Sequence, residues 1–154
     1  MRMDDLDRRI LDALQHDFPL RERPFDILAQ RLGVEPDLLW ERVEAMRKSG
    51  VIRRLGASLD SRRLGFHSTL AAVRVRPELV ARAAETIGRY PEVTHSYLRD
   101  HEFNIWFTII AGDEERIDTI LGAIGEELSL EPSDVLNLPM KRLFKLDARF
   151  HAQP

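Results

Sequence analysis

Four side chains that can transfer protons or bind anions stand at alternate positions of the chain: His95, Tyr97, Arg99 and His101. Successive side chains of a strand point to opposite faces of a sheet, so a regular strand places all four on one face. Imidazoles change charge near neutral pH, which suits them to both donation and acceptance of protons. A guanidinium binds carboxylates through paired hydrogen bonds. The row therefore indicates an active site, the alternative being a polar interface with a partner subunit.

A second group of cationic side chains precedes this row. The stretch from residue 47 to residue 63 carries six bases and one acid, namely Arg47, Lys48, Arg53, Arg54, Arg62, Arg63 and Asp60. The whole chain has 154 residues and a formal net charge of −3. A local surplus of cations on a mildly acidic protein indicates a site for an anion rather than a general affinity for nucleic acid.

Composition excludes several classes of protein. Cysteine is absent, which rules out a disulfide scaffold, a thiol nucleophile and any cysteine-ligated zinc or iron–sulfur site. No apolar run approaches ~18 residues, and the N-terminal residues lack the apolar core of a signal peptide. We therefore expect a soluble, cytoplasmic protein that does not bind a membrane.

The first part of the chain, residues 1–62, predicts a winged helix-turn-helix domain. Apolar side chains at helical spacing predict three short helices, of which the second ends at Gly33 and the third ends before Gly50. Val51–Leu59 is expected to form the strand pair of the wing. Arg53 and Arg54 then lie on a wing strand.

The second part, residues 63–154, predicts a ferredoxin-like domain, so that the chain as a whole is of the α+β class. The expected order is strand, helix, two strands, helix and strand, over Phe66–Arg76, a helix from Pro77, Val93–His101, Phe103–Ala111, Asp113–Leu128 and Val135–Leu146. Helices cover one face of such a sheet. Its other face, with the positions of Trp106, Phe107 and Ile109, would be a large apolar patch, so dimerisation is expected. The tail His151–Pro154 is expected to fray.

Two stretches carry a resemblance to a known family. They are Gly50–Val75 and Tyr90–Ile109, and the second contains Pro-x-Val-x-His-x-Tyr-x-Arg-x-His-x-x-Asn-x-Trp-Phe-Thr. The whole chain resembles the Lrp/AsnC regulators in its order of domains, with an AsnC-type effector domain after the winged helix. These two motifs narrow the resemblance to the siroheme decarboxylases and to their relatives in the biosynthesis of nitrite-reductase heme.

The resemblance implies a carboxy-lyase that removes CO₂ from two acetate side chains of siroheme and forms didecarboxysiroheme in heme biosynthesis. It implies a heterodimer, or a higher assembly, with a homologous subunit. No separate cofactor is expected, because siroheme carries the iron. Proton donation is expected from His95 or His101, the other histidine approaching the iron, with Arg99 orienting the departing carboxylate. The expected substrate-binding residues are Tyr97, Arg53, Arg54, Arg62, His67, Trp106 and Lys145.

Three alternatives remain open on the sequence alone. The chain could be a DNA-binding regulator, a heme-binding sensor on the same scaffold, or the non-catalytic partner of an active subunit. A DNA-reading third helix needs cationic or amide side chains toward phosphates and base edges. The third helix here instead carries acidic residues in its first two-thirds, which are Glu35, Asp37, Glu41 and Glu44. That charge argues against DNA binding.

Overall fold

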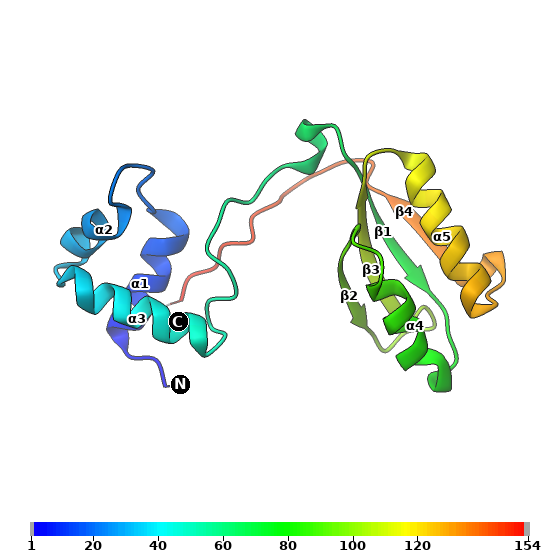
Figure 1. Ribbon diagram of the computed structural model, residues 1–154, viewed down its shortest axis with the longest axis horizontal. Coiled ribbons are helices and arrows are strands. Elements are labelled where there is room, and N and C mark those ends of the chain that lie inside the picture. Colours follow the sequence, from blue (N-terminus) through cyan, green and yellow to red (C-terminus); the bar gives the residue numbers. More distant parts are fainter. Residues whose placement is uncertain (1, 153–154) are drawn as a thin grey trace. The chain divides into compact units, whose positions relative to one another are not determined.

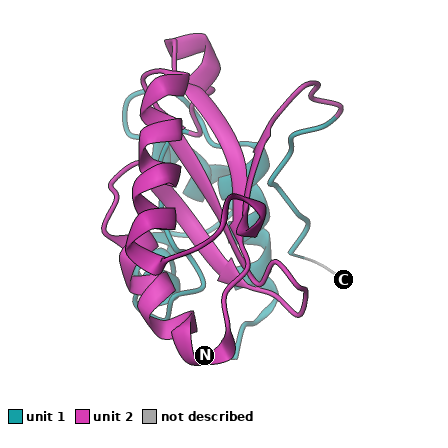
Figure 2. Cartoon of the chain, turned by 90° about the vertical axis from the view of Figure 1, so that its right-hand side faces the viewer, with its two compact units in different colours: residues 1–57, 145–154 teal, residues 58–144 magenta. Residues whose placement is uncertain are grey.

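The computed structural model describes residues 2–152, which divide into two compact units (Figure 2). The first unit comprises Met1–Ala57 together with Lys145–Pro154, and the second comprises Ser58–Phe144. The segment that begins at Lys145 therefore groups with the N-terminal helices, whereas the expected division into residues 1–62 and 63–154 placed it in the second domain. No helix among the described residues is long and apolar enough to cross a bilayer.

Three helices form the core of the first unit: α1 (Asp5–His16), α2 (Pro24–Leu32) and α3 (Pro36–Lys48). A capping box begins α1, because the side chains of Asp4 and Asp7 each accept a hydrogen bond from the backbone N–H of the other residue. Gly33 ends α2 with φ at +70°, a left-handed conformation that glycine adopts without a steric penalty. The apolar helix faces meet around Ile10, Leu28, Ala29, Leu39, Val43, Met46 and Ile52. The predicted helix-turn-helix core is thus present.

The wing expected over Val51–Leu59 is not formed as a strand pair. No strand occurs between α3 and the short 3₁₀ helix η1 (Ser61–Leu64), so Arg53 and Arg54 lie in irregular, exposed backbone. Ile52 is buried in the core of the first unit, while Leu55 and Leu59 are exposed. Two strands of about four residues each are only marginally stable as an isolated ribbon.

The second unit is a four-stranded sheet with two helices on one face (Figure 1). Its elements are β1 (His67–Val73), η2 (Pro77–Leu79), α4 (Val80–Gly88), β2 (Val93–Leu98), β3 (Ile105–Ala111), α5 (Glu114–Leu128), η3 (Pro132–Asp134) and β4 (Val135–Pro139). The strand order is β2-β3-β1-β4, and every neighbouring pair is antiparallel. This confirms the predicted ferredoxin-like arrangement. The last strand is shorter than expected, ending at Pro139 rather than at Leu146, since proline has no N–H to extend a ladder.

The two faces of this sheet differ sharply. Alternate residues of β3 are buried against α4 and α5, and these are Ile105, Phe107, Ile109 and Ala111. Phe107 and Ile109 were expected on the uncovered face with Trp106, but the alternation of the strand places both in the core and Trp106 on the other face. On the opposite face no element of the second unit covers the side chains, and cross-strand partners place Leu70 beside both Thr108 and Leu138 there. Leu70 is 43% exposed and Leu138 is 44% exposed. We call this the open face of the sheet, and its apolar side chains are what dimerisation would cover.

Candidate functional site

The open face carries His95 and Tyr97 because of an irregularity in β2. Val93 pairs with Ile109 and packs into the helix-covered core, yet His95 pairs with Thr108 on the open face. The ladder between Val93 and His95 contains a register shift, as at a β-bulge, which moves the following side chains to the other face. In a regular strand, His95 would share the buried face of Val93.

Arg99 and His101, the other two residues of the predicted row, lie beyond the end of β2. β2 ends at Leu98, three residues before the expected end, and Arg99 and His101 lie in the turn that leads to β3. Both side chains approach Trp106: the Arg99 guanidinium carbon lies 5.9 Å from a ring centroid of Trp106, and the His101 and Trp106 ring centroids are 6.2 Å apart. Tyr97 is the cross-strand partner of Trp106.

We call His95, Tyr97, Arg99, His101 and Trp106 the open-face cluster. His95 extends it along β2, with its ring centroid 6.1 Å from that of Tyr97. The indole of Trp106 is fixed by its N–H, which donates to the carbonyl of Phe103 at 2.7 Å. The cluster combines a flat, half-buried aromatic wall with two imidazoles, a phenol and one guanidinium.

The hydrogen bonding of His101 determines which of its nitrogens can donate a proton. Its Nδ1 accepts a hydrogen bond from the backbone N–H of Phe103 at 3.1 Å. A neutral imidazole that accepts at Nδ1 carries its proton on Nε2. In this tautomer, Nε2–H can donate a hydrogen bond to a bound ligand.

Asn104 holds this turn to the sheet, although the sequence patterns assigned it no function. Its side chain accepts from the backbone N–H of Val75 at 3.1 Å and donates to the carbonyl of Val75 at 2.8 Å. Its backbone N–H donates to Val73, and its carbonyl accepts from Arg99. Asn104 stands in the family motif, and this was the only signal in the sequence that could have identified it.

Replacing Asn104 by alanine is expected to reduce the free energy of unfolding by about 1–3 kcal/mol, because it leaves both backbone polar groups of the buried Val75 without their side-chain partners. Chemical denaturation monitored by circular dichroism measures this change. Asp100→Ala, in the exposed part of the same turn, serves as the control and should shift stability by no more than about 0.5 kcal/mol. Equal effects of the two substitutions would contradict this role for Asn104.

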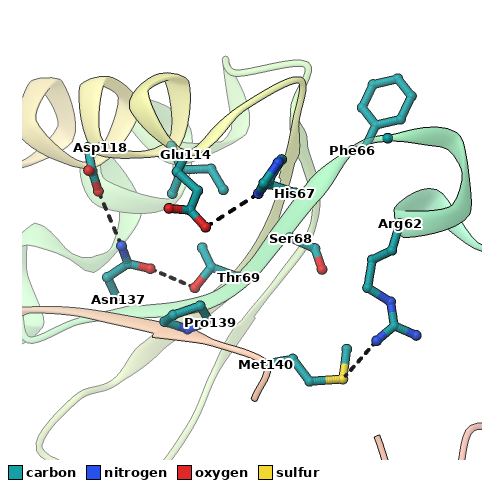
Figure 3. Close-up of a pocket in the computed structure, with 12 residues that line it drawn as sticks. Arg62, Phe66, His67, Ser68, Thr69, Glu114, Asp118, Asn137, Pro139 and Met140 are labelled. Carbon is teal, nitrogen blue, oxygen red and sulfur yellow. Dashed lines mark hydrogen bonds and ion pairs between the residues drawn. The ribbon is translucent and has the colours of Figure 1, made fainter. Parts of the chain in front are cut away.

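Arg62 and His67 line a different site, a pocket of about 460 Å³ in the second unit (Figure 3). His67 pairs with the buried Ala111, which places it on the helix-covered face, opposite His95. Its Nδ1 lies 3.4 Å from Oε1 of Glu114, at the start of α5. Arg62 reaches the same pocket from η1 and contacts the sulfur of Met140 at 3.6 Å.

One side of this pocket is polar and partly acidic, and the rest is apolar, lined by Phe66, Ile117, Pro139 and Met140. The hydroxyl of Thr69 donates to Oδ1 of Asn137 at 2.6 Å, and the Asn137 amide in turn donates to Asp118 at 3.3 Å. With Glu114, the pocket presents two carboxylates and one guanidinium.

The predicted site residues are thus distributed over three places. The open-face cluster contains the three expected catalytic residues together with Tyr97 and Trp106. Arg62 and His67 line the pocket on the opposite face of the sheet. Arg53, Arg54 and Lys145 belong to the first unit.

Two family models match the chain, one in each unit. Residues 7–53 match the siroheme decarboxylase NirDL-like helix-turn-helix domain. Residues 63–145 match the AsnC-like ligand-binding domain. The matches agree with the order of domains in the structure.

Curated relatives align along almost the whole chain. The siroheme decarboxylase alpha subunit of Nitratidesulfovibrio vulgaris is 42% identical over 148 residues, covering 96% of this chain and 82% of that protein. The siroheme decarboxylase NirD subunit of Pseudomonas aeruginosa is 38% identical over 148 residues, covering 96% of this chain and 96% of that protein.

Solved structures show the same fold. A crystal structure of the siroheme decarboxylase NirDL in complex with an iron-uroporphyrin III analogue matches with a TM-score of 0.67 at 31% identity, covering 87% of this chain and 44% of that chain. The regulator AsnC of E. coli matches with a TM-score of 0.78 at 20% identity, covering 97% of this chain and 99% of that one. At this identity, the match shows only that the two proteins have the same fold. With sequence matches along nearly its full length, this chain belongs to the family of siroheme decarboxylase subunits.

Proposed function

We propose that this chain is a subunit of a siroheme decarboxylase, which removes CO₂ from two acetate side chains of siroheme to give didecarboxysiroheme. The observation that carries the proposal is the near full-length match to curated siroheme decarboxylase subunits at 38–42% identity. The enzyme acts in the cytoplasm as an assembly with a homologous subunit. The iron enters as part of the substrate.

The open-face cluster supplies what this reaction requires. In each step the bond between the acetate methylene and its carboxylate breaks, the electron pair passes into the macrocycle, and CO₂ leaves. A proton added at the methylene carbon then completes the methyl group, so each CO₂ released consumes one proton. His101, once protonated to the imidazolium, is the donor and returns to the neutral imidazole, and His95 is the second imidazole available for the iron or for the second proton.

The guanidinium and the aromatic rings position the substrate. Arg99 binds a carboxylate by charge-assisted hydrogen bonds from its N–H groups, while its guanidinium carbon lies over the ring of Trp106. Trp106 and Tyr97 provide a surface against which the flat ring can pack. A role in substrate binding remains a prediction for five further residues, which are Arg53, Arg54, Arg62, His67 and Lys145.

Arg99→Ala is expected to lower kcat/KM for siroheme about 10- to 100-fold, since a hydrogen bond to a charged group contributes about 1.5–3 kcal/mol. Arg99→Lys keeps the charge but loses the two-pronged geometry, so its loss should be intermediate. Steady-state kinetics of the assembled enzyme measure both. Arg76→Ala, an exposed arginine of the same unit that pairs with Glu78, is the control. A kcat/KM for Arg99→Ala within twofold of the control would refute this role.

The proposed activity is tested by anaerobic incubation of siroheme with this chain, alone and with the homologous subunit, followed by mass spectrometry of the pigment. Loss of two CO₂ units is expected, and comparison of the two mixtures shows whether the partner is required. A bound pigment of unchanged mass in both mixtures would instead support a heme-binding sensor. If neither mixture bound the pigment, the proposed decarboxylase function would be refuted.

DNA binding is disfavoured by the surface of α3. Glu35, Asp37 and Glu41 are exposed along its first half. Near its end, the Arg47 guanidinium is bound to Glu44 at 3.0 Å and lowers the pKa of that carboxyl, so this cation is already paired. A DNA-binding regulator would show affinity that falls steeply as the salt concentration rises.

A further inference from the structure

The C-terminal segment lies along α1 in the first unit and is held there through its backbone. The Gln15 amide donates to the carbonyl of Phe150 at 3.0 Å, and its oxygen accepts from the N–H of the same residue at 3.2 Å. The N–H of Ala152 donates to Oδ1 of Asp12 at 2.7 Å. These bonds hold both neighbours of His151 against α1. The tail from His151 was expected to fray, whereas its residues 151–152 are docked in the structure, and residues 153–154 lie outside the described residues.

The position of His151 brings three metal-binding side chains together. Asp12 and His16 stand four residues apart on one face of α1. The imidazole of His151 stacks on that of His16, with ring centroids 4.9 Å apart and planes 22° from parallel. One ligand atom from each of Asp12, His16 and His151 lies within 4.8 Å of the other two.

We propose that Asp12, His16 and His151 form a binding site for a divalent transition-metal ion, with zinc as the ion that fits best. Two imidazoles and one carboxylate are zinc ligands, and a water molecule completes a tetrahedron. Zinc–ligand distances of about 2.0–2.2 Å place tetrahedral ligand atoms about 3.4 Å apart. The ligand atoms therefore need to close by little more than 1 Å. The two imidazoles must also turn out of their stacked arrangement, so that both ring planes meet at the ion.

The hydrogen bonds around Asp12 suit this role. Its Oδ1 is engaged by the N–H of Ala152, which orients the carboxylate and leaves Oδ2 for the ion. An ion bound here joins the C-terminal segment to α1. Since the site exists only when that segment is docked, metal binding stabilises the docked state by mass action. This inference is independent of the proposed decarboxylase activity.

Zinc titration of the untagged, full chain by calorimetry tests the site. One ion per chain is expected, together with a rise in Tm on zinc addition. Co²⁺ in place of zinc should give the intense visible absorption of a tetrahedral site. His16→Ala and His151→Ala are each expected to weaken zinc binding at least tenfold and to remove the zinc-dependent rise in Tm.

Two further variants separate metal binding from other causes. Asp12→Asn keeps an oxygen that can accept from the N–H of Ala152 but removes the carboxylate, so zinc affinity should fall while Tm without zinc changes little. His67→Ala removes a histidine that lies 3.4 Å from a carboxylate in the other unit, and zinc affinity should remain unchanged. Zinc binding that survives in the double variant His16→Ala, His151→Ala, or no binding at micromolar zinc to the unaltered chain, would overturn the proposal.

Discussion

Replacing His95 and His101 together by alanine is expected to reduce the rate of siroheme decarboxylation about 10²- to 10⁴-fold, the usual contribution of positioned proton donors. Both imidazoles belong to the open-face cluster, and the hydrogen bond from the backbone N–H of Phe103 to Nδ1 orients the ring of neutral His101. Single-turnover assays of the assembled enzyme, with mass spectrometry of the pigment, measure the rate directly. His101→Ala alone should account for most of the loss.

Binding of the substrate should persist in this double variant, because Arg99 and Trp106 remain. Absorbance titration with siroheme measures it, and Ser96→Ala, on the same strand but paired with the buried Phe107, is the control for local folding. Unchanged turnover in a folded double variant would exclude these histidines. If the corresponding change in the homologous subunit then abolished turnover, this chain would be the non-catalytic partner.

Leu70→Asp is expected to weaken association with the homologous subunit at least 100-fold. Leu70 occupies the middle of the open face, between Thr108 of β3 and Leu138 of β4. A carboxylate that a partner buries there loses its hydration, its cross-strand neighbours Thr108 and Leu138 carry no charge to pair with it, and an unpaired buried charge is strongly destabilising. Activity, which we propose to depend on the assembly, should fall in parallel.

Analytical ultracentrifugation of the mixed subunits measures this association. Leu98→Asp is the matched control, because Leu98 pairs with Ile105 and so belongs to the other face, where it is 65% exposed. It should leave association within about threefold of the unaltered chain. Equal assembly of both variants would show that the open face is not the surface that the partner covers.

The sequence by itself determined the secondary structure and topology of most of the chain. Helical spacing of apolar residues located α1, α2 and α3, and alternation located β1 and β3, since both patterns are local consequences of backbone geometry. The residue types in His95, Tyr97, Arg99 and His101 also indicated the chemistry, because imidazole and guanidinium have few equivalents for proton transfer and carboxylate binding.

Only the tertiary structure decided where those side chains lie. The register shift after Val93 transfers His95 and Tyr97 to the open face. Asn104, bound to Val75, holds the turn in which Arg99 and His101 lie near Trp106. Separate contacts place His67 on the opposite face and dock the C-terminal segment on α1. Each of these features depends on hydrogen bonds or packing between residues far apart in sequence, whereas periodicity reports only the preference of each segment for helix or strand.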